Sequence, residues 1–405
     1  MTGLDAVTDR LLRDLAPQVL AVLVRRWGRF DACEDAVQDA LLAAALQWPV
    51  EGIAANPKAW LVTVASRRLA AEARERREER AASTPGPIDD VESHDDTLTL
   101  LFLCCHPSIP PSSQIALTLR AVGGLTTGQI ARAFLVPEAT VGQRIGRAKE
   151  AITSAGARFE LPSAHEWEER LAVVLHVLHL IFNEGYAADA GAGLVDVRLT
   201  SEAIRLTRRL HRLLPGEGEV AGLLALMLLT DARRPARTGP GGILVPLAEQ
   251  DRSRWNRILV SEGVALIADS LRSAPLGPYQ VRAAIAAVHD EAPSDEETDW
   301  RRILALYETL QRYWPGPMVS LDHAVAVAMV HGPAAGLDLV AALEEESVWR
   351  GHHRVETVRA HLLDMAGDLD GARAAYAKAA RRTASLPERR YLEHKARQAD
   401  PRMDR

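Results

Sequence analysis

The chain has 405 residues and a formal net charge of −6, and nearly half of its residues are hydrophobic. This length allows two or three domains with full-sized cores, and the negative charge excludes a generally basic nucleic-acid coat, so any DNA contact must come from local basic faces. Three cysteines, two of them adjacent, cannot form a disulfide framework, which indicates a reducing compartment.

The sequence contains no candidate membrane anchor. Its first ten residues, MTGLDAVTDR, include acidic side chains and no long apolar run, so we expect no ordinary signal peptide. The longest apolar stretch, Leu171 to Phe182, is interrupted by two histidines and is shorter than the ~20 residues that a membrane helix requires. We therefore expect a soluble, cytoplasmic protein that does not contact a membrane.

Helices are predicted for the whole chain, because Ala, Leu, Arg and Glu are abundant and no segment alternates apolar and polar residues over a sustained length. The first is predicted over about Asp9 to Trp27 and the second over about Ala32 to Trp48. The second helix is predicted to bury a stripe formed by Val37, Ala40, Leu41, Ala44 and Trp48. Four polar residues near its beginning are predicted to be exposed: Glu34, Asp35, Gln38 and Asp39. Acids there complement the helix dipole, and the same face also suits docking of a basic partner.

A third helix is predicted to begin at Pro57 and to continue to about Arg80. Its first half is predicted to bury Trp60, Leu61, Val64 and Ala65. Its second half carries six arginines: Arg67, Arg68, Arg74, Arg76, Arg77 and Arg80. The glutamates between them are typical of a solvated helix with i, i+4 ion pairs. However, this basic helix stands upstream of a second DNA-binding candidate, and two such elements in one chain indicate recognition of two sites.

A linker is predicted over residues 81–96, AASTPGPIDDVESHDD, because Pro, Gly, Ser and acids replace the helical periodicity there. The helical pattern resumes at Thr97, with one helix ending near Pro107 and another running from about Ser112 to Ala121.

Cys104, Cys105 and His106 suggest a metal cluster, but neighbouring side chains on a helix point about 100° apart and no second Cys/His pair stands at zinc spacing. We interpret both cysteines as core residues.

Residues 125–149, LTTGQIARAFLVPEATVGQRIGRAK, predict two short helices joined by a tight turn. Thr126 and Thr127 are N-cap candidates, and the first helix is predicted to bury Ile130 and Phe134. Pro137 ends that helix and suits the first position of the next one.

The second of these helices has two different faces. Its buried stripe is predicted to contain Val141, Ile145 and Ala148. Its opposite face carries hydrogen-bond donors: Thr140, Gln143, Arg144 and Arg147. Such a helix can enter the major groove, where Arg and Gln side chains reach base edges and phosphates. An ordinary amphipathic hairpin with a solvated basic face would give the same pattern.

Taken together, residues 1–160 resemble a bacterial sigma-70 class transcription factor of the extracytoplasmic-function (ECF) type. ACEDAVQDALLAAALQW is similar to the helix with which this family binds core RNA polymerase, and NPKAWLVTVASRRLAAEARERRE is similar to its helix for melting and reading the −10 promoter element. The segment 125–149 is similar to its −35-reading helix-turn-helix. The resemblance implies an initiation factor that binds core polymerase and promoter DNA and is not an enzyme.

The resemblance also implies roles for individual residues. Those facing the clamp helices of the largest polymerase subunit would be Asp35, Gln38 and Asp39. Those near −10 DNA would be Arg67, Arg68 and Arg74. Those reading the −35 element would be Thr140, Gln143, Arg144 and Arg147. No catalytic residue, metal or cofactor is expected.

The residues after 160 predict a large helical extension, which begins with an apolar helix ending in the sequence FNEGY. His176, His179 and Glu184 lie on this helix, and we interpret the histidines as core residues rather than as metal ligands.

Further along, a degenerate tetratricopeptide (TPR) pattern with a period of about 34 residues is recognisable. Residues that match one repeat are Ala203, Thr207, Leu210 and Pro215, followed by Leu224, Ala225 and Leu228. A better-formed unit, VETVRAHLLDMAGDLDGARAAYAKAARR, contains a Gly-Asp turn and places Ala360, Ala372, Tyr376 and Ala379 in register. TPR-like solenoids generally bind proteins or peptides in a concave groove.

A subset of ECF factors carries a TPR-like C-terminal extension that is thought to take part in control, and this chain resembles that subset, including its FNEGY segment. The implied division is sigma region 2 over residues 1–80, a linker over 81–96, sigma region 4 over 97–160 and a TPR-like regulatory domain over 161–405. The expected fold class is all-α, and the expected partners are core RNA polymerase, promoter DNA and a protein or peptide bound by the extension.

One alternative is a helix-turn-helix regulator with a TPR-like interaction domain that does not bind core polymerase. It differs from a sigma factor at residues 34–39 and 60–77, which a simple regulator would not need. A scaffold or an enzyme is disfavoured, because the sequence has no Gly-rich phosphate loop, paired metal motif or nucleophile elbow.

Overall fold

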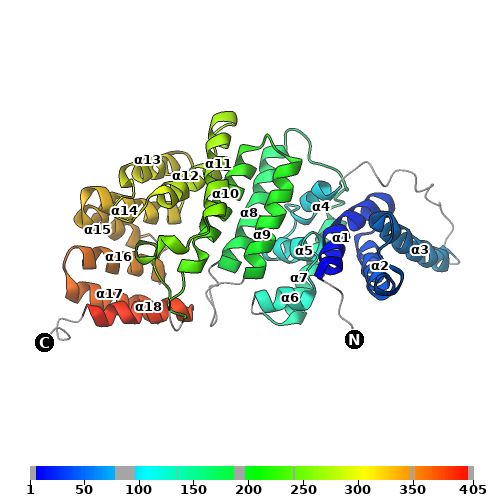
Figure 1. Cartoon of the computed structure of the whole chain (residues 1–405), viewed down its shortest axis with the longest axis horizontal. Helices are drawn as coiled ribbons and strands as arrows, with labels where there is room; N and C mark the ends of the chain where they lie inside the picture. The colour runs from blue at the N-terminus through cyan, green and yellow to red at the C-terminus, as the bar shows by residue number, and fades with distance from the viewer. Residues whose placement is uncertain are drawn as a thin grey trace. The chain divides into compact units, whose positions relative to one another are not determined.

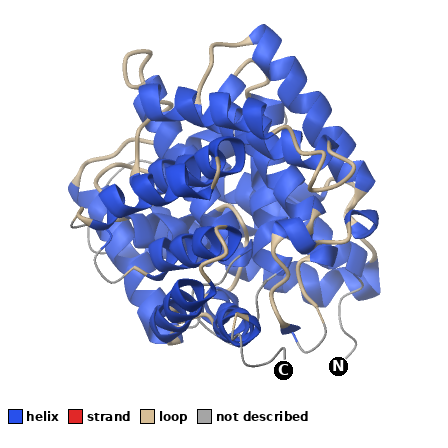
Figure 2. Cartoon of the chain, turned by 90° about the vertical axis from the view of Figure 1, so that its left-hand side faces the viewer, coloured by secondary structure: helices blue, strands red, loops and turns tan. Residues whose placement is uncertain are grey.

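The computed structural model describes residues 6–77, 96–134, 136–186, 197–239, 242–346, 349 and 352–399. These residues form α-helices and short 3-10 helices, and they contain no strand beyond a single bridge between Thr238 and Leu244 (Figures 1 and 2). The all-α prediction is therefore confirmed. The chain divides into two compact units, Met1–Leu180 and Ile181–Arg405. Most of the predicted linker, residues 81–95, lies outside the described residues.

The first unit begins with three helices, α1 (Ala6–Trp27), α2 (Phe30–Glu51) and α3 (Pro57–Arg77). The three helices pack against one another. The indole rings of Trp48 on α2 and Trp60 on α3 lie 5.5 Å apart and tilted, an arrangement that aromatic pairs favour.

Most of the predicted core positions of this three-helix domain are buried. On α2 the buried residues include Val37, Ala40, Ala44 and Trp48, whereas Leu41 is only half-buried. On α3, Leu61 and Ala65 are fully buried, but Trp60 and Val64 are only half-buried. The side chains of Arg76 and Arg77, and the whole of Arg80, lie outside the described residues.

Four further helices form a second domain in the first unit: α4 (Thr97–Cys104), α5 (Pro111–Ala121), α6 (Thr127–Ala133) and α7 (Glu138–Ser154). Cys104 and Cys105 are fully buried, which confirms that they are core residues. Burial raises the pKa of the Cys105 thiol to about 12, although a hydrogen bond with Thr118 opposes the shift. These thiols are therefore protonated and unreactive at neutral pH.

Helix α8 (Trp167–Tyr186) begins in the first unit and packs there on α4. The rings of Trp167 and Phe102 lie 5.3 Å apart, and Arg170 donates a hydrogen bond to the Phe102 carbonyl at 3.0 Å. His176 is exposed and His179 is half-buried. The interpretation of His176 as a core residue is therefore wrong, because its position falls on the outer face of an otherwise apolar helix.

The second unit is a succession of helices in which each packs against its neighbours in sequence, as the TPR pattern predicts. These helices are α9 (Val197–Leu213), α10 (Gly218–Ala232), α11 (Arg257–Ser273), α12 (Pro278–Glu291), α13 (Trp300–Tyr313), α14 (Pro317–His331), α15 (Pro333–Glu344), α16 (His353–Met365), α17 (Leu369–Arg382) and α18 (Leu386–Gln398).

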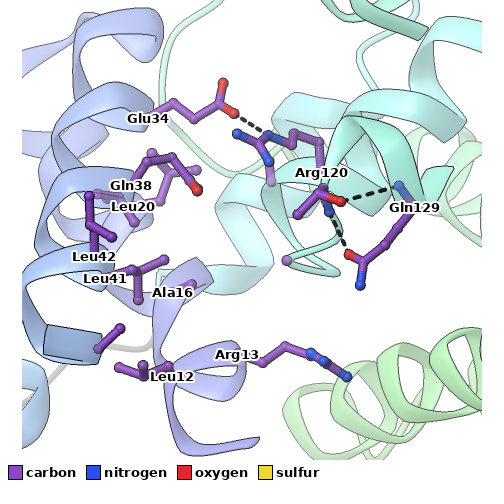
Figure 3. A pocket seen from close by; sticks show the side chains of 15 residues that line it. Leu12, Arg13, Ala16, Leu20, Glu34, Gln38, Leu41, Leu42, Arg120 and Gln129 are labelled. Atoms are coloured by element: carbon purple, nitrogen blue, oxygen red, sulfur yellow. Dashed lines mark hydrogen bonds and ion pairs between the residues drawn. The ribbon is translucent and has the colours of Figure 1, made fainter. Parts of the chain in front are cut away.

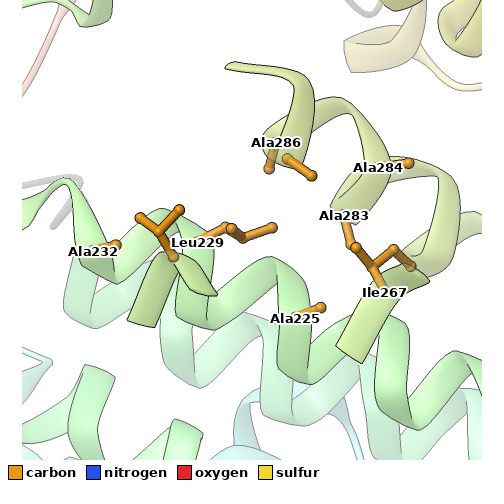
Figure 4. Packing of buried hydrophobic residues seen from close by; sticks show 9 residues of the cluster. Ala225, Leu229, Ala232, Ile267, Ala283, Ala284 and Ala286 are labelled. Atoms are coloured by element: carbon orange, nitrogen blue, oxygen red, sulfur yellow. The ribbon is translucent and has the colours of Figure 1, made fainter. Parts of the chain in front are cut away.

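Small side chains allow these helices to approach closely. A cluster between α10, α11 and α12 contains Ala225, Leu229, Ile267 and Ala283 (Figure 4). At Gly222 on α10, a Cβ atom would lie only 2.6 Å from the backbone nitrogen of Gln280, so no larger residue fits without movement of the backbone.

The predicted repeat positions are buried, with one exception. Buried positions are Ala203, Thr207, Leu210, Leu224, Ala225, Leu228, Ala360, Ala372, Tyr376 and Ala379, whereas Pro215 is exposed. The predicted Gly-Asp turn is also present: Gly367 has φ +80°, which favours glycine, and the side chain of Asp368 caps α17.

The repeat pattern does not predict the segment between α10 and α11. Its described residues include the short 3-10 helices η1 (Arg234–Ala236), η3 (Leu247–Glu249) and η4 (Arg252–Arg254). The Arg252 side chain is buried and donates hydrogen bonds to the carbonyls of His289 and Ala292, each at 2.7 Å. From the sequence alone, an arginine in a polar stretch is expected at the surface. Arg252 is buried because carbonyl groups at the end of α12, which is distant in the chain, accept its hydrogen bonds.

The buried stripe of α7 gives a stability test. Val141 is 1% exposed, whereas its neighbour Gly142 is exposed with open space around its Cα. We expect Val141→Asp to destabilise residues 127–154 by about 3 kcal/mol, because it buries an unpaired charge. Gly142→Asp adds the same charge at the surface and should leave stability nearly unchanged. Hydrogen–deuterium exchange of full-length protein measures both effects, and equal protection in the two variants would contradict the assigned core face.

Candidate functional site

Helix α2 presents the residues expected to dock core polymerase. Asp35 and Gln38 are exposed, and Asp39 is half-buried. They occupy this face because the opposite side of α2 is held in the core by its apolar stripe. The Asp39 carboxylate forms an ion pair with the guanidinium of Arg68 on α3. We call Asp35, Gln38 and Asp39 the docking face.

An apolar strip on α2 continues the docking face and was not predicted from the sequence. Leu42, Leu46 and Val50 are 60%, 68% and 86% exposed. They follow Gln38 at i, i+4 spacing, so the four side chains lie along one line of the helix. This i, i+4 spacing is visible in the sequence and could have predicted the apolar strip. Adjacent exposed leucine and valine side chains are typical of a protein interface.

Glu34 was predicted to be exposed beside the docking face, and this prediction is wrong. It is 6% exposed, because Arg120 on α5 donates a hydrogen bond to its Oε1 at 2.6 Å and Lys149 on α7 lies 2.7 Å from its Oε2. Lys149 also lies 2.7 Å from the Asp31 carboxylate. Burial alone would lower the pKa of Lys149, but Glu34 and Asp31 raise it overall, so the ammonium is charged.

The arginines of α3 that were expected near −10 DNA differ in their contacts with acidic residues. Arg67 and Arg74 are exposed. Arg68 is also exposed, but it contacts two carboxylates, those of Asp39 and of Glu72 at 3.5 Å. The structure therefore brings a predicted docking residue and a predicted DNA-binding residue together in one ion pair.

The helix-turn-helix is formed by α6 and α7. The Thr126 side chain accepts from the backbone N–H of Gln129, and the Gln129 side chain accepts from that of Thr126, which completes a capping box. Pro137 is the N-cap of α7 and lies just before the helix, rather than at its first position as predicted. Phe134 is half-buried rather than buried.

The side chains of α7 fall on the two predicted faces. Val141, Ile145, Ala148 and Ile152 are buried against the rest of the four-helix domain. On the other side, Gln143 and Arg147 are exposed, and Thr140 and Arg144 are half-buried. The donors are therefore available for contact with DNA while the stripe holds the helix in place.

In the described part of the chain, no three His, Cys, Asp or Glu side chains lie close enough together to hold a metal ion. Among the same residues, no helix is both long and apolar enough to span a bilayer.

Comparison with known families matches three parts of the chain. Residues 11–79 match Sigma-70 region 2, and residues 99–152 match Sigma-70, region 4. Residues 170–271 match a family of unknown function, DUF6596. The first two matches cover the docking face, the arginines of α3 and the helix-turn-helix.

The whole chain is similar to an uncharacterized protein of Rhizobium meliloti (strain 1021), with 41% identity over 400 residues that cover 95% of this chain and 94% of the relative. Among solved structures, the crystal structure of yeast Tom70 aligns with 98% of this chain and 85% of its own, at 11% identity and a TM-score of 0.37. This chain belongs to the sigma-70 family of transcription factors, with a helical C-terminal extension.

The exposed face of α7 gives a DNA-binding test. We expect Arg144→Ala to lose about 1–3 kcal/mol of promoter affinity at fixed salt, with relaxed preference at one base pair if the contact is to a base edge. Arg272→Ala on α11 removes an equally charged side chain that is exposed in the second unit and should have no effect. Titration of polymerase holoenzyme onto labelled promoter DNA measures the promoter affinity of both variants. Superimposable binding curves for Arg144→Ala and the wild type would contradict the prediction that Arg144 contacts DNA.

Proposed function

We propose that this protein is an ECF-type initiation factor that binds core RNA polymerase through the docking face and directs it to promoters. In this proposal, Arg67, Arg68 and Arg74 approach the −10 element. The −35 element is read by Thr140, Gln143, Arg144 and Arg147. The protein acts in the cytoplasm, where polymerase and chromosome meet, and catalyses no reaction itself.

The observation that carries this proposal is the exposure of the docking face next to the basic helix α3, within a chain that also has a helix-turn-helix. A regulator that only binds DNA would use the helix-turn-helix and would have no use for exposed Asp35, Gln38 and the apolar strip. Complementary charge and an apolar contact together are what a specific protein partner requires.

We further propose that the helical extension controls the activity of the DNA-binding half. Helix α8 is anchored on the four-helix domain through Trp167 and Arg170, so the segment that leads into the extension is part of the fold of the first unit. A protein or peptide bound by the extension could then bias the activity of the factor. The competing possibility is an extension that only recruits a partner.

The docking face gives a direct test of polymerase binding. We expect Asp35→Lys/Asp39→Lys to weaken core binding at least 10-fold, or by about 1.4 kcal/mol, through charge reversal at the interface. Equilibrium titration of fluorescent full-length protein with purified core polymerase measures this loss.

The matched control is Asp269→Lys/Asp370→Lys, which makes the same charge change at two residues of the second unit whose side chains are 74% and 78% exposed. This control should bind as the wild type does. Undiminished binding by the docking-face variant would remove the basis for the assignment.

Truncation tests the role of the extension. A chain that ends at Tyr186 retains α8 and its contacts with Phe102. If the extension exerts intramolecular control, this chain should change the level of run-off transcription with core polymerase at least 3-fold when no other protein is present. Circular dichroism checks that the truncated chain is folded. Transcription equal to that of the full-length chain would leave recruitment as the role of the extension.

A further inference from the structure

Helix α9, the helix that follows α8 in the second unit, is strongly basic. It carries five arginines and a single acidic residue, Glu202, within 17 residues. Helix α3, which is proposed to approach the −10 element, carries six basic and two acidic residues and thus has the same excess of positive charge. We propose that α9 binds phosphate groups of duplex DNA upstream of the −35 element. This inference rests on the proposed function and adds a third DNA contact to it.

The arginines of α9 share one side of the helix, here called the basic face: Arg198, Arg205, Arg208, Arg209 and Arg212. The opposite side is held in the core by Leu199, Ala203, Leu206 and Leu210, each at most 2% exposed. Four of the arginines, all except Arg208, fall within about 60° of one another around the helix axis, since each residue turns the helix by about 100°. Burial of the apolar side therefore directs the basic face outward.

The side chains of the basic face are accessible to a ligand. Arg198 and Arg212 are exposed, and the three arginines between them are half-buried. Glu202 pairs with Arg205 at 2.6 Å and holds that guanidinium at the helix surface.

An exposed ion pair on the basic face can exchange its carboxylate for a phosphate. The side chains of Arg208 and of Glu262 on α11 are 38% and 41% exposed, and such exposed pairs add little to stability. By contrast, Arg120 and Glu34 in the first unit form a pair whose side chains are only 18% and 7% exposed (Figure 3). Loss of Arg120 would leave a buried carboxylate without its partner, so that arginine is committed to the fold.

The length and charge of the basic face suit duplex DNA. Arg198 and Arg212 are 14 residues apart, which corresponds to about 21 Å along the helix. A duplex of that length carries about 12 phosphates, and the arginine guanidinium matches phosphate geometry. Core polymerase is expected to meet the acidic docking face with basic residues of its own, so the basic face does not suit the same partner.

The chain connection favours DNA next to the −35 element. Helix α8 contacts the four-helix domain at Trp167 and continues for 20 residues, or about 30 Å, to Tyr186. Helix α9 begins at Val197, and the intervening chain can span at most about 40 Å. Val197 therefore lies within about 70 Å of Trp167, a distance equal to about 20 base pairs. Downstream of the −35 element the duplex leads to the −10 contacts, whereas the upstream duplex is free for α9.

The first test requires no polymerase. Full-length protein is titrated with a fluorescent duplex of about 40 base pairs and arbitrary sequence at several salt concentrations. Arg198→Gln/Arg212→Gln removes two charges from the basic face. It should make the slope of log K against log salt shallower by about 1.8, because each phosphate contact contributes about 0.9.

Two control variants accompany this test. Arg301→Gln/Arg312→Gln removes two exposed arginines from α13 and should keep the wild-type slope. Arg198→Lys/Arg212→Lys keeps the charges of α9 and should also keep the slope, which excludes an effect of altered folding. A wild-type slope for Arg198→Gln/Arg212→Gln would overturn the proposal and would leave the basic face solvated or bound to an acidic protein.

The second test locates the contact on the promoter. Polymerase holoenzyme is titrated with two fragments of one promoter that this protein recognises. One fragment ends at the upstream edge of the −35 element, and the other extends about 25 base pairs farther, beyond the reach of α9. The wild type and the α13 control should bind the longer fragment at least about 5-fold more tightly, because only that fragment offers the added phosphates. Arg198→Gln/Arg212→Gln should bind both fragments as tightly as the wild type binds the shorter one.

The two failures are distinguishable. Equal wild-type affinity for both fragments would overturn the upstream contact and leave the proposed function intact. Absence of promoter binding by every holoenzyme, the wild type included, would overturn the proposed function and the upstream contact with it.

Discussion

The burial of an apolar stripe constrains both helices of the candidate site, α2 and α7. In α2 the stripe includes Val37 and Ala44, and in α7 it includes Val141 and Ile145. Because a helix places residues at i, i+3 and i+4 on one side, burial of the stripe also fixes which polar residues face outward. The docking face and the exposed face of α7 are consequences of that packing rather than separate features.

The same constraint explains how much could be predicted from the sequence. The helices of the first unit, the turn before Pro137 and the buried cysteines all follow from local periodicity and local turn chemistry. The capping box of α6 follows from Thr126 and Gln129 three residues apart. These features depend only on residues that are close together in the chain, so a single sequence is enough to predict them.

Long-range contacts could not be predicted in this way. Glu34 and Arg120 are 86 residues apart in the chain. The spacing to Phe30 and Val37 places Glu34 on the buried side of α2, but nothing in that local pattern shows which cations pair with it. The burial of Glu34 depends on which cations the four-helix domain brings to it. His176 is the opposite case. Its apolar neighbours predicted that it would be buried, but its side chain is exposed.

The second unit combines repeat packing with a specific polar network. Its small residues, such as Gly222 and Ala225, set the close approach of successive helices. The irregular segment before α11 is held by buried charges. Arg233 lies 2.5 Å from Asp290, and Arg252 donates hydrogen bonds to two carbonyls at the C-terminal end of α12. Buried charges that form ion pairs and hydrogen bonds favour one arrangement of the chain, because other arrangements leave them without these partners. This network fixes the shape of the extension near its first helices.

We infer that this chain directs core RNA polymerase to promoters. The most direct test is run-off transcription by core polymerase and the full-length protein on a template library with randomised −10 and −35 elements, followed by sequencing of transcript 5′ ends. We expect initiation at discrete positions, with two enriched sequence blocks upstream, and we expect the −35 block to change when Arg144 is replaced. Transcripts that start without sequence preference, at the level of core polymerase alone, would contradict it.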